Sequence, residues 1–132
     1  MSSAERPSVT NVDIIDIARR SDDFRREVMT GPMMQIVVMT IPPGEEIGEE
    51  THPDTDQVLY FVDGTGEAVL DGERSEVTAG RLVFVRAGVL HNFINTGDQP
   101  LRLVSAYAPP EHEAGTVHAT KAEADAAEHH HH

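Results

Sequence analysis

The sequence predicts an all-β domain, a sandwich or barrel with a short helix near each end. Two observations carry this prediction. The run from Met33 to Ile41 is apolar at nearly every position, as in a strand that is buried on both faces. After it, short strand-like segments alternate with turns rich in Gly and Asp, which favours antiparallel sheets over a parallel sheet with crossover helices. A chain of 132 residues makes one domain, which buries roughly 68% of its unfolded surface.

The N-terminal part is predicted to contain little regular structure before the first buried strand. Residues 1–10 are polar and expected to be disordered. Asn11 is expected to cap a short helix over Val12 to Arg20, which has apolar residues at helical spacing. The sequence Pro42-Pro43-Gly44 ends the apolar strand Met33 to Ile41.

The strands that follow complete a predicted barrel domain over residues 11–110. Asp71-Gly72 is the strongest hairpin signal in the chain. The aromatic residues at strand spacing are expected in the core: Phe61, Phe84, Phe93 and Tyr107. The predicted strands are Gln57–Val62, Glu67–Leu70, Ser75–Thr78, Arg81–Val85, Leu90–Asn95 and Leu101–Tyr107.

A tail over residues 111–128 follows the barrel. Thr120 and Glu123 have the spacing of a capping box, which predicts a short helix ending near Glu128. His112 and His118 lie in the polar part of this tail and are expected on the surface. Residues 129–132 are four histidines, interpreted as a remnant of a purification tag and left out of the function.

Composition excludes several classes of partner. The 23 acidic and 10 basic residues give a net charge of −13, which disfavours nucleic acid and anionic membrane surfaces. The chain has no Cys, so a disulfide or a thiolate metal site is impossible. No apolar run approaches the ~20 residues of a membrane span, and no signal peptide pattern is visible at the start. A cytoplasmic protein that binds a small molecule is therefore expected.

Two segments carry polar residues that can meet at one metal ion. Glu50 and His52 alternate with Thr51, so on an extended strand their side chains point to the same face. Gln57 on the next strand and His91 from another hairpin can converge with them inside a closed barrel. Two imidazoles, a carboxylate and an amide oxygen suit a divalent ion of Mn, Fe, Co, Ni, Cu or Zn.

The spacing of these segments resembles that of the two cupin motifs. The first runs through Gly44, Glu50, His52, Gln57 and Gly64, and the second through Gly80, Gly88, His91 and Asn95. The resemblance implies a double-stranded β-helix (jelly-roll) barrel and the metal ligands Glu50, His52, Gln57 and His91. The chain departs from the usual motifs where Glu50 replaces a His, Gln57 replaces a Glu and Arg86 replaces a Pro.

The resemblance extends over most of the chain. The segments IPPGEEIGEETHPDTDQ and YAPPEHEAGTVHATKAEADAAE are similar to those of small bacterial cupins often labelled sugar-phosphate (mannose-6-phosphate) isomerases. The resemblance also implies a homodimer, because cupins commonly pair through sheet edges. Residues 9–30 are then expected to be a docking or exchanged element.

Other interpretations of the candidate residues stay open in the sequence. His52 could pair with Asp54 in a different register, although the motif spacing would then be broken. The histidines could be hydrogen-bonded core residues, Gln57 could hold only a water, and Glu50 could belong to an acidic loop. Phe61 and Phe93 share strand parity with the ligands and are expected to line the mouth of a pocket. Asn95 is expected to stabilise a turn.

Three classes of function fit this pattern. The first is a metal-dependent isomerase or lyase acting on a small sugar-like or carbonyl compound. A dioxygenase follows instead if the metal is iron or copper. The others are a barrel that binds a small molecule or metal without turnover, and an inert barrel whose polar site is filled by water.

Overall fold

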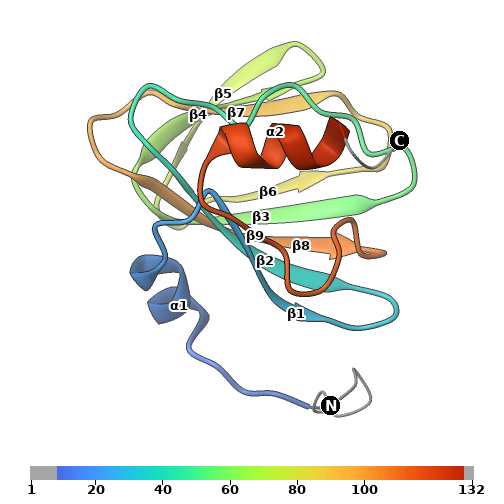
Figure 1. The fold of residues 1–132 in the computed structure, drawn as a ribbon. Helices are drawn as coiled ribbons and strands as arrows, with labels where there is room; N and C mark the ends of the chain where they lie inside the picture. The colour runs from blue at the N-terminus through green and yellow to red at the C-terminus, as the bar shows by residue number, and fades with distance from the viewer. Residues whose placement is uncertain (1–8, 130–132) are drawn as a thin grey trace.

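The computed structural model describes residues 9–129, and the predictions for residues 1–8 and 130–132 lie outside this range. Two antiparallel sheets face each other and form a jelly-roll barrel, which confirms the predicted all-β class (Figure 1). The larger sheet has the order β6 (Leu82–Val85), β3 (Asp56–Asp63), β8 (Leu101–Ala108), β2 (Gln35–Ile41), β1 (Arg25–Thr30), β9 (Val117–His118). The smaller sheet has the order β5 (Glu73–Thr78), β4 (Thr65–Leu70), β7 (His91–Asn95).

The main hydrophobic core fills the space between the two sheets. Leu59, Phe61 and Leu103 enter it from the larger sheet, and Ala68 and Phe93 enter it from the smaller one, all of them fully buried. Strand alternation places these residues on inner faces, where burial of apolar area stabilises the sandwich. Met33 to Ile41 is a strand as predicted, but it starts at Gln35 because Met33 and Met34 lie in the exposed turn after β1.

A two-residue turn and a close backbone contact at a glycine connect the strands of the smaller sheet. Asp71 and Gly72 have φ angles of 52° and 86°, and Leu70 pairs with Glu73, so β4 and β5 form the predicted two-residue hairpin. At Gly66 an added Cβ would lie 2.5 Å from the carbonyl oxygen of Ile94. Only glycine allows β4 and β7 to approach in this way.

A short helix covers the outer face of the larger sheet. Helix α1 (Ile14–Arg20) begins one residue after Asp13, whose Oδ1 accepts a hydrogen bond from Asp16 N at 3.0 Å. The prediction that Asn11 caps the helix was wrong, because the chain enters the helix two residues later. Ala18 of α1 packs on Val38 of β2 and forms a smaller core outside the barrel.

The C-terminal helix lies against the barrel itself. Thr120 Oγ1 accepts a hydrogen bond from Glu123 N at 3.2 Å, so the predicted cap stabilises the start of α2 (Lys121–His129). Ala124 is buried in the main core. Figure 1 shows α2 and α1 as separate elements on different parts of the barrel.

Two short strands and one aromatic residue differ from the sequence prediction. Strands β1 and β9 were not predicted; in this chain residues 9–30 pack on their own barrel as α1 and β1, and the homodimer stays a prediction. Phe84 was predicted in the core but is 59% exposed. Val85 pairs with the inward-facing Gln57, so strand alternation turns Phe84 to the outer face.

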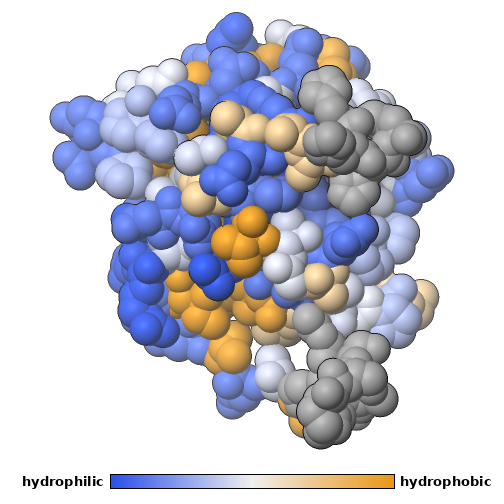
Figure 2. All heavy atoms as spheres, viewed as in Figure 1, coloured by the Kyte–Doolittle hydropathy of each residue, from blue (hydrophilic) through white to orange (hydrophobic). Residues whose placement is uncertain are grey.

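Figure 2 shows a largely hydrophilic face with apolar side chains gathered beside α1. Among the residues that the structure describes, no helix is long and apolar enough to cross a membrane.

Candidate metal centre

Glu50 and His91 are neighbours because their backbones pair. Glu50 N donates to His91 O and His91 N donates to Glu50 O, both at 2.9 Å. This antiparallel bridge extends the smaller sheet beyond β7. Directly opposite residues in such a pair carry their side chains on the same face. The pairing of two distant segments therefore places a carboxylate beside an imidazole.

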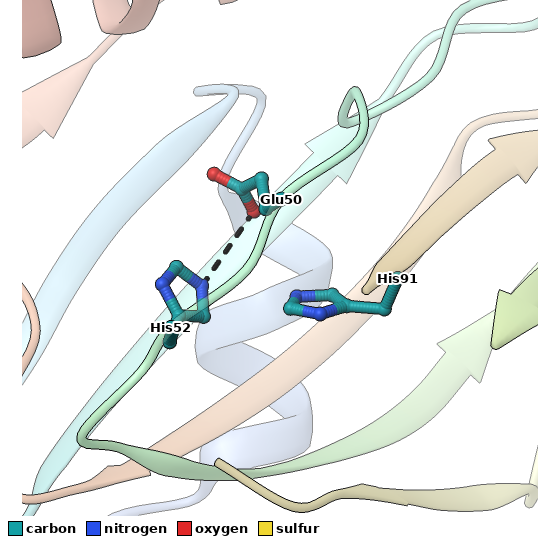
Figure 3. Close-up of side chains that lie close together, drawn as sticks. All are labelled: Glu50, His52 and His91. Atoms are coloured by element: carbon teal, nitrogen blue, oxygen red, sulfur yellow. Dashed lines mark ion pairs between the residues drawn. The ribbon is translucent and has the colours of Figure 1, made fainter. Parts of the chain in front are cut away.

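His52 joins this pair from the same segment as Glu50. It lies two residues further along, and its carbonyl oxygen accepts a hydrogen bond from Gly88 N at 2.9 Å. The second motif thus holds the backbone of the first in place. One potential ligand atom from each of Glu50, His52 and His91 lies within 4.8 Å of the other two. Figure 3 shows Glu50 and His52 side by side, with the His91 ring pointing toward them from β7.

Each histidine has a partner at Nδ1 that orients its ring. His91 Nδ1 lies 2.9 Å from the carbonyl oxygen of Val89, which can only accept, so Nδ1 carries the proton. His52 Nδ1 lies 3.3 Å from Glu111 Oε2. The Nε2 atoms of both rings are buried and have no hydrogen-bond partner. A donor at Nδ1 leaves the lone pair on Nε2, which is the arrangement of metal-binding histidines.

Gln57 pairs with Tyr107 on the larger sheet and keeps one buried polar atom without a hydrogen bond. Its Nε2 donates to Ser105 Oγ at 2.9 Å, which fixes the amide. Its Oε1 is buried without a hydrogen-bond partner. An unsatisfied buried oxygen costs free energy, so the position fits an amide oxygen that contacts an ion or its bound water. Direct ligation by Gln57 stays a prediction.

The structure decides several of the other interpretations. Asp54 is exposed and does not belong to the cluster, so the register that pairs it with His52 was wrong. Phe61 and Phe93 are fully buried in the core, with Phe93 6.2 Å from His91 between ring centroids, and their lining of a pocket stays a prediction. Asn95 stabilises a turn as predicted, because its Nδ2 donates to Ile41 O and Gln99 O, both at 2.8 Å.

The sequence missed a group of residues that the C-terminal strap brings to the site. This strap, residues 109–118, runs from β8 to β9 and carries Glu111 and His112. The fully buried Gln35 holds it: Gln35 Nε2 donates to His112 O at 2.7 Å, and Gln35 Oε1 accepts from His112 N at 3.0 Å. The prediction that His112 and His118 are surface residues was wrong, since both are half-buried.

Tyr107 connects the strap to the histidines. Its ring is edge-on to His112 with centroids 5.1 Å apart, and edge-on to His52 with centroids 6.0 Å apart. On the larger sheet Tyr107 pairs with Gln57 on one side and Gln35 on the other. These three inward-facing side chains therefore form one row, and that common row was not visible in the sequence.

The environment shifts the pKa values of the site in different directions. Burial lowers the pKa of His91, and this effect outweighs its hydrogen bond to Val89. Burial also opposes protonation of His52, but the hydrogen bond that His52 donates to Glu111 and the charge of Glu50 outweigh it and raise the pKa of His52. The hydrogen bond to His52 lowers the pKa of Glu111. Burial raises the pKa of Tyr107 to about 12, so its hydroxyl keeps its proton.

His112 makes the stability of the metal-free protein depend on pH. Burial, and then the charge of Arg25, lower its pKa to about 3, below the ~6.5 of an unfolded histidine. The contribution of neutral His112 is complete above pH 6.5 and is lost as the pH falls toward 3. Between pH 7 and pH 4 we expect His112 to lower the free energy of unfolding of the wild type by on the order of 3 kcal/mol. The His112→Gln variant should lose correspondingly less of its free energy of unfolding. Urea unfolding at pH 7 and pH 4 measures the difference.

His118→Gln is the matched control for that experiment. A wild type and a His112→Gln variant with the same loss of stability between pH 7 and pH 4 would contradict the assignment.

Several known proteins are similar to this chain in sequence and fold. The Cupin domain family matches residues 37–107. The uncharacterized protein YrkC of Bacillus subtilis is 40% identical over 129 residues, covering 93% of this chain and 68% of its own length. The polyketide synthase CurC of Streptomyces cyaneus is 31% identical over 111 residues, covering 79% of this chain and 71% of its own.

A solved structure gives the same result at the level of the backbone. The protein BH2720 of Bacillus halodurans is 42% identical, with a TM-score of 0.88 over 94% of this chain and 97% of its own. Together with the paired motif segments and the jelly-roll barrel, these matches show that the chain belongs to the cupin superfamily as a small single-domain member.

Proposed function

We propose that this cupin is a metal-dependent enzyme of the isomerase or lyase type that acts on a small sugar-like or carbonyl compound. The observation that carries the proposal is the convergence of two buried, unpartnered Nε2 atoms with the Glu50 carboxylate. Leaving such atoms unsatisfied is costly in a protein interior, and a divalent ion satisfies them together.

The donor set fits a divalent transition metal. Glu50, His52 and His91 would hold the ion, and the Gln57 oxygen would contact it or a bound water. When bound, such an ion acts as a Lewis acid that polarises a substrate oxygen. Tyr107, whose ring lies edge-on to His52, keeps its hydroxyl proton and would serve as a hydrogen-bond donor to a substrate oxygen that gains negative charge.

Burial of the site supports a small substrate. His52 and His91 are 7% and 2% exposed, so a large polymer cannot reach them without opening the barrel. Proton transfer next to a carbonyl needs only a compact polar molecule and a site from which water is largely excluded.

The proposal predicts metal-dependent proton exchange. Protein without the tag, reconstituted separately with Mn, Fe, Co, Ni, Cu or Zn, is incubated in D2O with sugar phosphates, 1,2-diols and 1,2-diketones. We expect deuterium at a carbon next to a carbonyl, detected by NMR, with at least one metal and not with His52→Ala/His91→Ala. A protein that binds about one ion yet exchanges no proton and turns over no compound would instead be a binding barrel.

A second candidate function follows from the same donor set. Two imidazoles and one carboxylate are the ligands of non-haem Fe(II) oxygenases. If iron is the ion retained after purification, oxygen consumption with the diol and diketone panel distinguishes a dioxygenase from an isomerase.

A further inference from the structure

Arg25 is a buried cation next to the candidate metal centre. It is 2% exposed, whereas the following residue on β1, Arg26, faces solvent, so Arg25 points into the barrel. Its guanidinium lies over the Phe24 ring, with Cζ 5.3 Å from the centroid. Its Nε is buried without a hydrogen-bond partner. A buried guanidinium is costly unless an acceptor compensates it.

The candidate metal centre and the residues beside it contain further polar atoms without a hydrogen-bond partner. His52 Nε2, His91 Nε2, His112 Nε2 and Gln57 Oε1 are also buried without a hydrogen-bond partner. The charge of Arg25 influences the pKa values of His52, Tyr107 and His112, and so lies near all three. Five buried polar atoms without a hydrogen-bond partner are groups that a bound polar ligand would satisfy.

The charges around this space favour an anion. Glu50 and Glu111 are negative and Arg25 is positive, whereas an imidazole that binds a metal ion is neutral. A divalent ion held by Glu50, His52 and His91 adds two positive charges to that of Arg25. Glu50 and Glu111 balance two of these three charges, so one positive charge stays unbalanced. A monoanion restores neutrality and provides the oxygen acceptors that Arg25 Nε lacks.

We propose that the space between Arg25 and the metal position binds a small organic monoanion, a carboxylate whose oxygen accepts a hydrogen bond from the Arg25 guanidinium. This inference rests on the proposed metal function and narrows its substrate class to hydroxy or keto acids. Arg25 is then a residue that determines specificity, since a neutral molecule of the same shape leaves the guanidinium unpaired.

The test compares glycolate with its neutral isostere glycolamide by isothermal titration calorimetry on zinc-loaded protein. We expect glycolate to bind the wild type at least about 30-fold more tightly than glycolamide, the ratio expected when one partner of a buried charge pair is lost. Arg25→Gln should abolish this preference, and Arg25→Lys should keep part of it. Arg26→Gln, a change of the neighbouring exposed arginine, should leave both affinities unchanged.

Metal content and metal-free titrations separate this inference from the proposed function. Equal affinities for glycolate and glycolamide in the wild type would overturn the inference, as would an unchanged preference in Arg25→Gln at unchanged zinc content. Protein that binds no zinc contradicts the metal function alone. The Arg25 site is then judged on metal-free wild type, where a glycolate preference that Arg25→Gln abolishes supports it and equal affinities overturn it.

Discussion

Replacing both histidines, in His52→Ala/His91→Ala, is expected to remove about one equivalent of bound divalent metal. Each imidazole offers a buried Nε2 with no hydrogen-bond partner, and the Nδ1 partners of both rings fix the lone pairs in the site. Without them only Glu50 and the amide Gln57 remain, a donor set too weak to hold a transition metal. Plasma mass spectrometry on protein freed of residues 129–132 measures the loss.

The control for this experiment is His118→Ala, which removes a half-buried histidine outside the cluster and should keep the full metal content. Circular dichroism should show the same β-sheet spectrum for the double variant, because the backbone bridge between Glu50 and His91 does not use the imidazole. Metal content that is equal in the wild type and the double variant would place the ion elsewhere in the chain.

Much of the barrel could be predicted because local sequence patterns indicate its strands and turns. The alternation of apolar and polar residues sets which side chains face inward, and Asp71-Gly72 specifies a hairpin through its backbone preferences alone. Phe84 shows the limit of such reasoning. Its strand is at a sheet edge, where register decides which face is buried, and only pairing with β3 reveals that register.

The candidate metal centre was partly predictable for a similar reason. Glu50, His52 and His91 occupy motif positions, and the structure brings them together. Arg25 and Glu111 carry no such signal, because each reaches the site through contacts between segments far apart in sequence. The strap resembles an ordinary polar tail until Gln35, 76 and 77 residues away from Glu111 and His112, satisfies its backbone.

Gln35→Met is expected to weaken metal binding although Gln35 touches none of the candidate ligands. The amide bonds Thr30 Oγ1, His112 O, His112 N and Glu111 N at 2.7 to 3.3 Å, and methionine has nearly the same shape but can make none of these bonds. The strap keeps its contacts with β1 at residues 115–118 but loses those at Glu111 and His112, so Glu111 is no longer held where it orients His52. We expect a 10- to 100-fold lower metal affinity and a loss of about 2 to 4 kcal/mol in the free energy of unfolding.

Competition with a fluorescent zinc chelator measures the affinity, and hydrogen exchange at the amides of Glu111 and His112 measures the attachment of the strap. Gln99→Met is the matched control, since its side chain is exposed. Faster exchange with unchanged zinc affinity would show that Glu111 does not position His52. Faster exchange together with weaker zinc affinity in Gln35→Met, but not in Gln99→Met, would show that the buried amide on β2 controls the metal centre through the strap. A structural defect elsewhere would leave the exchange rates and the zinc affinity uncoupled.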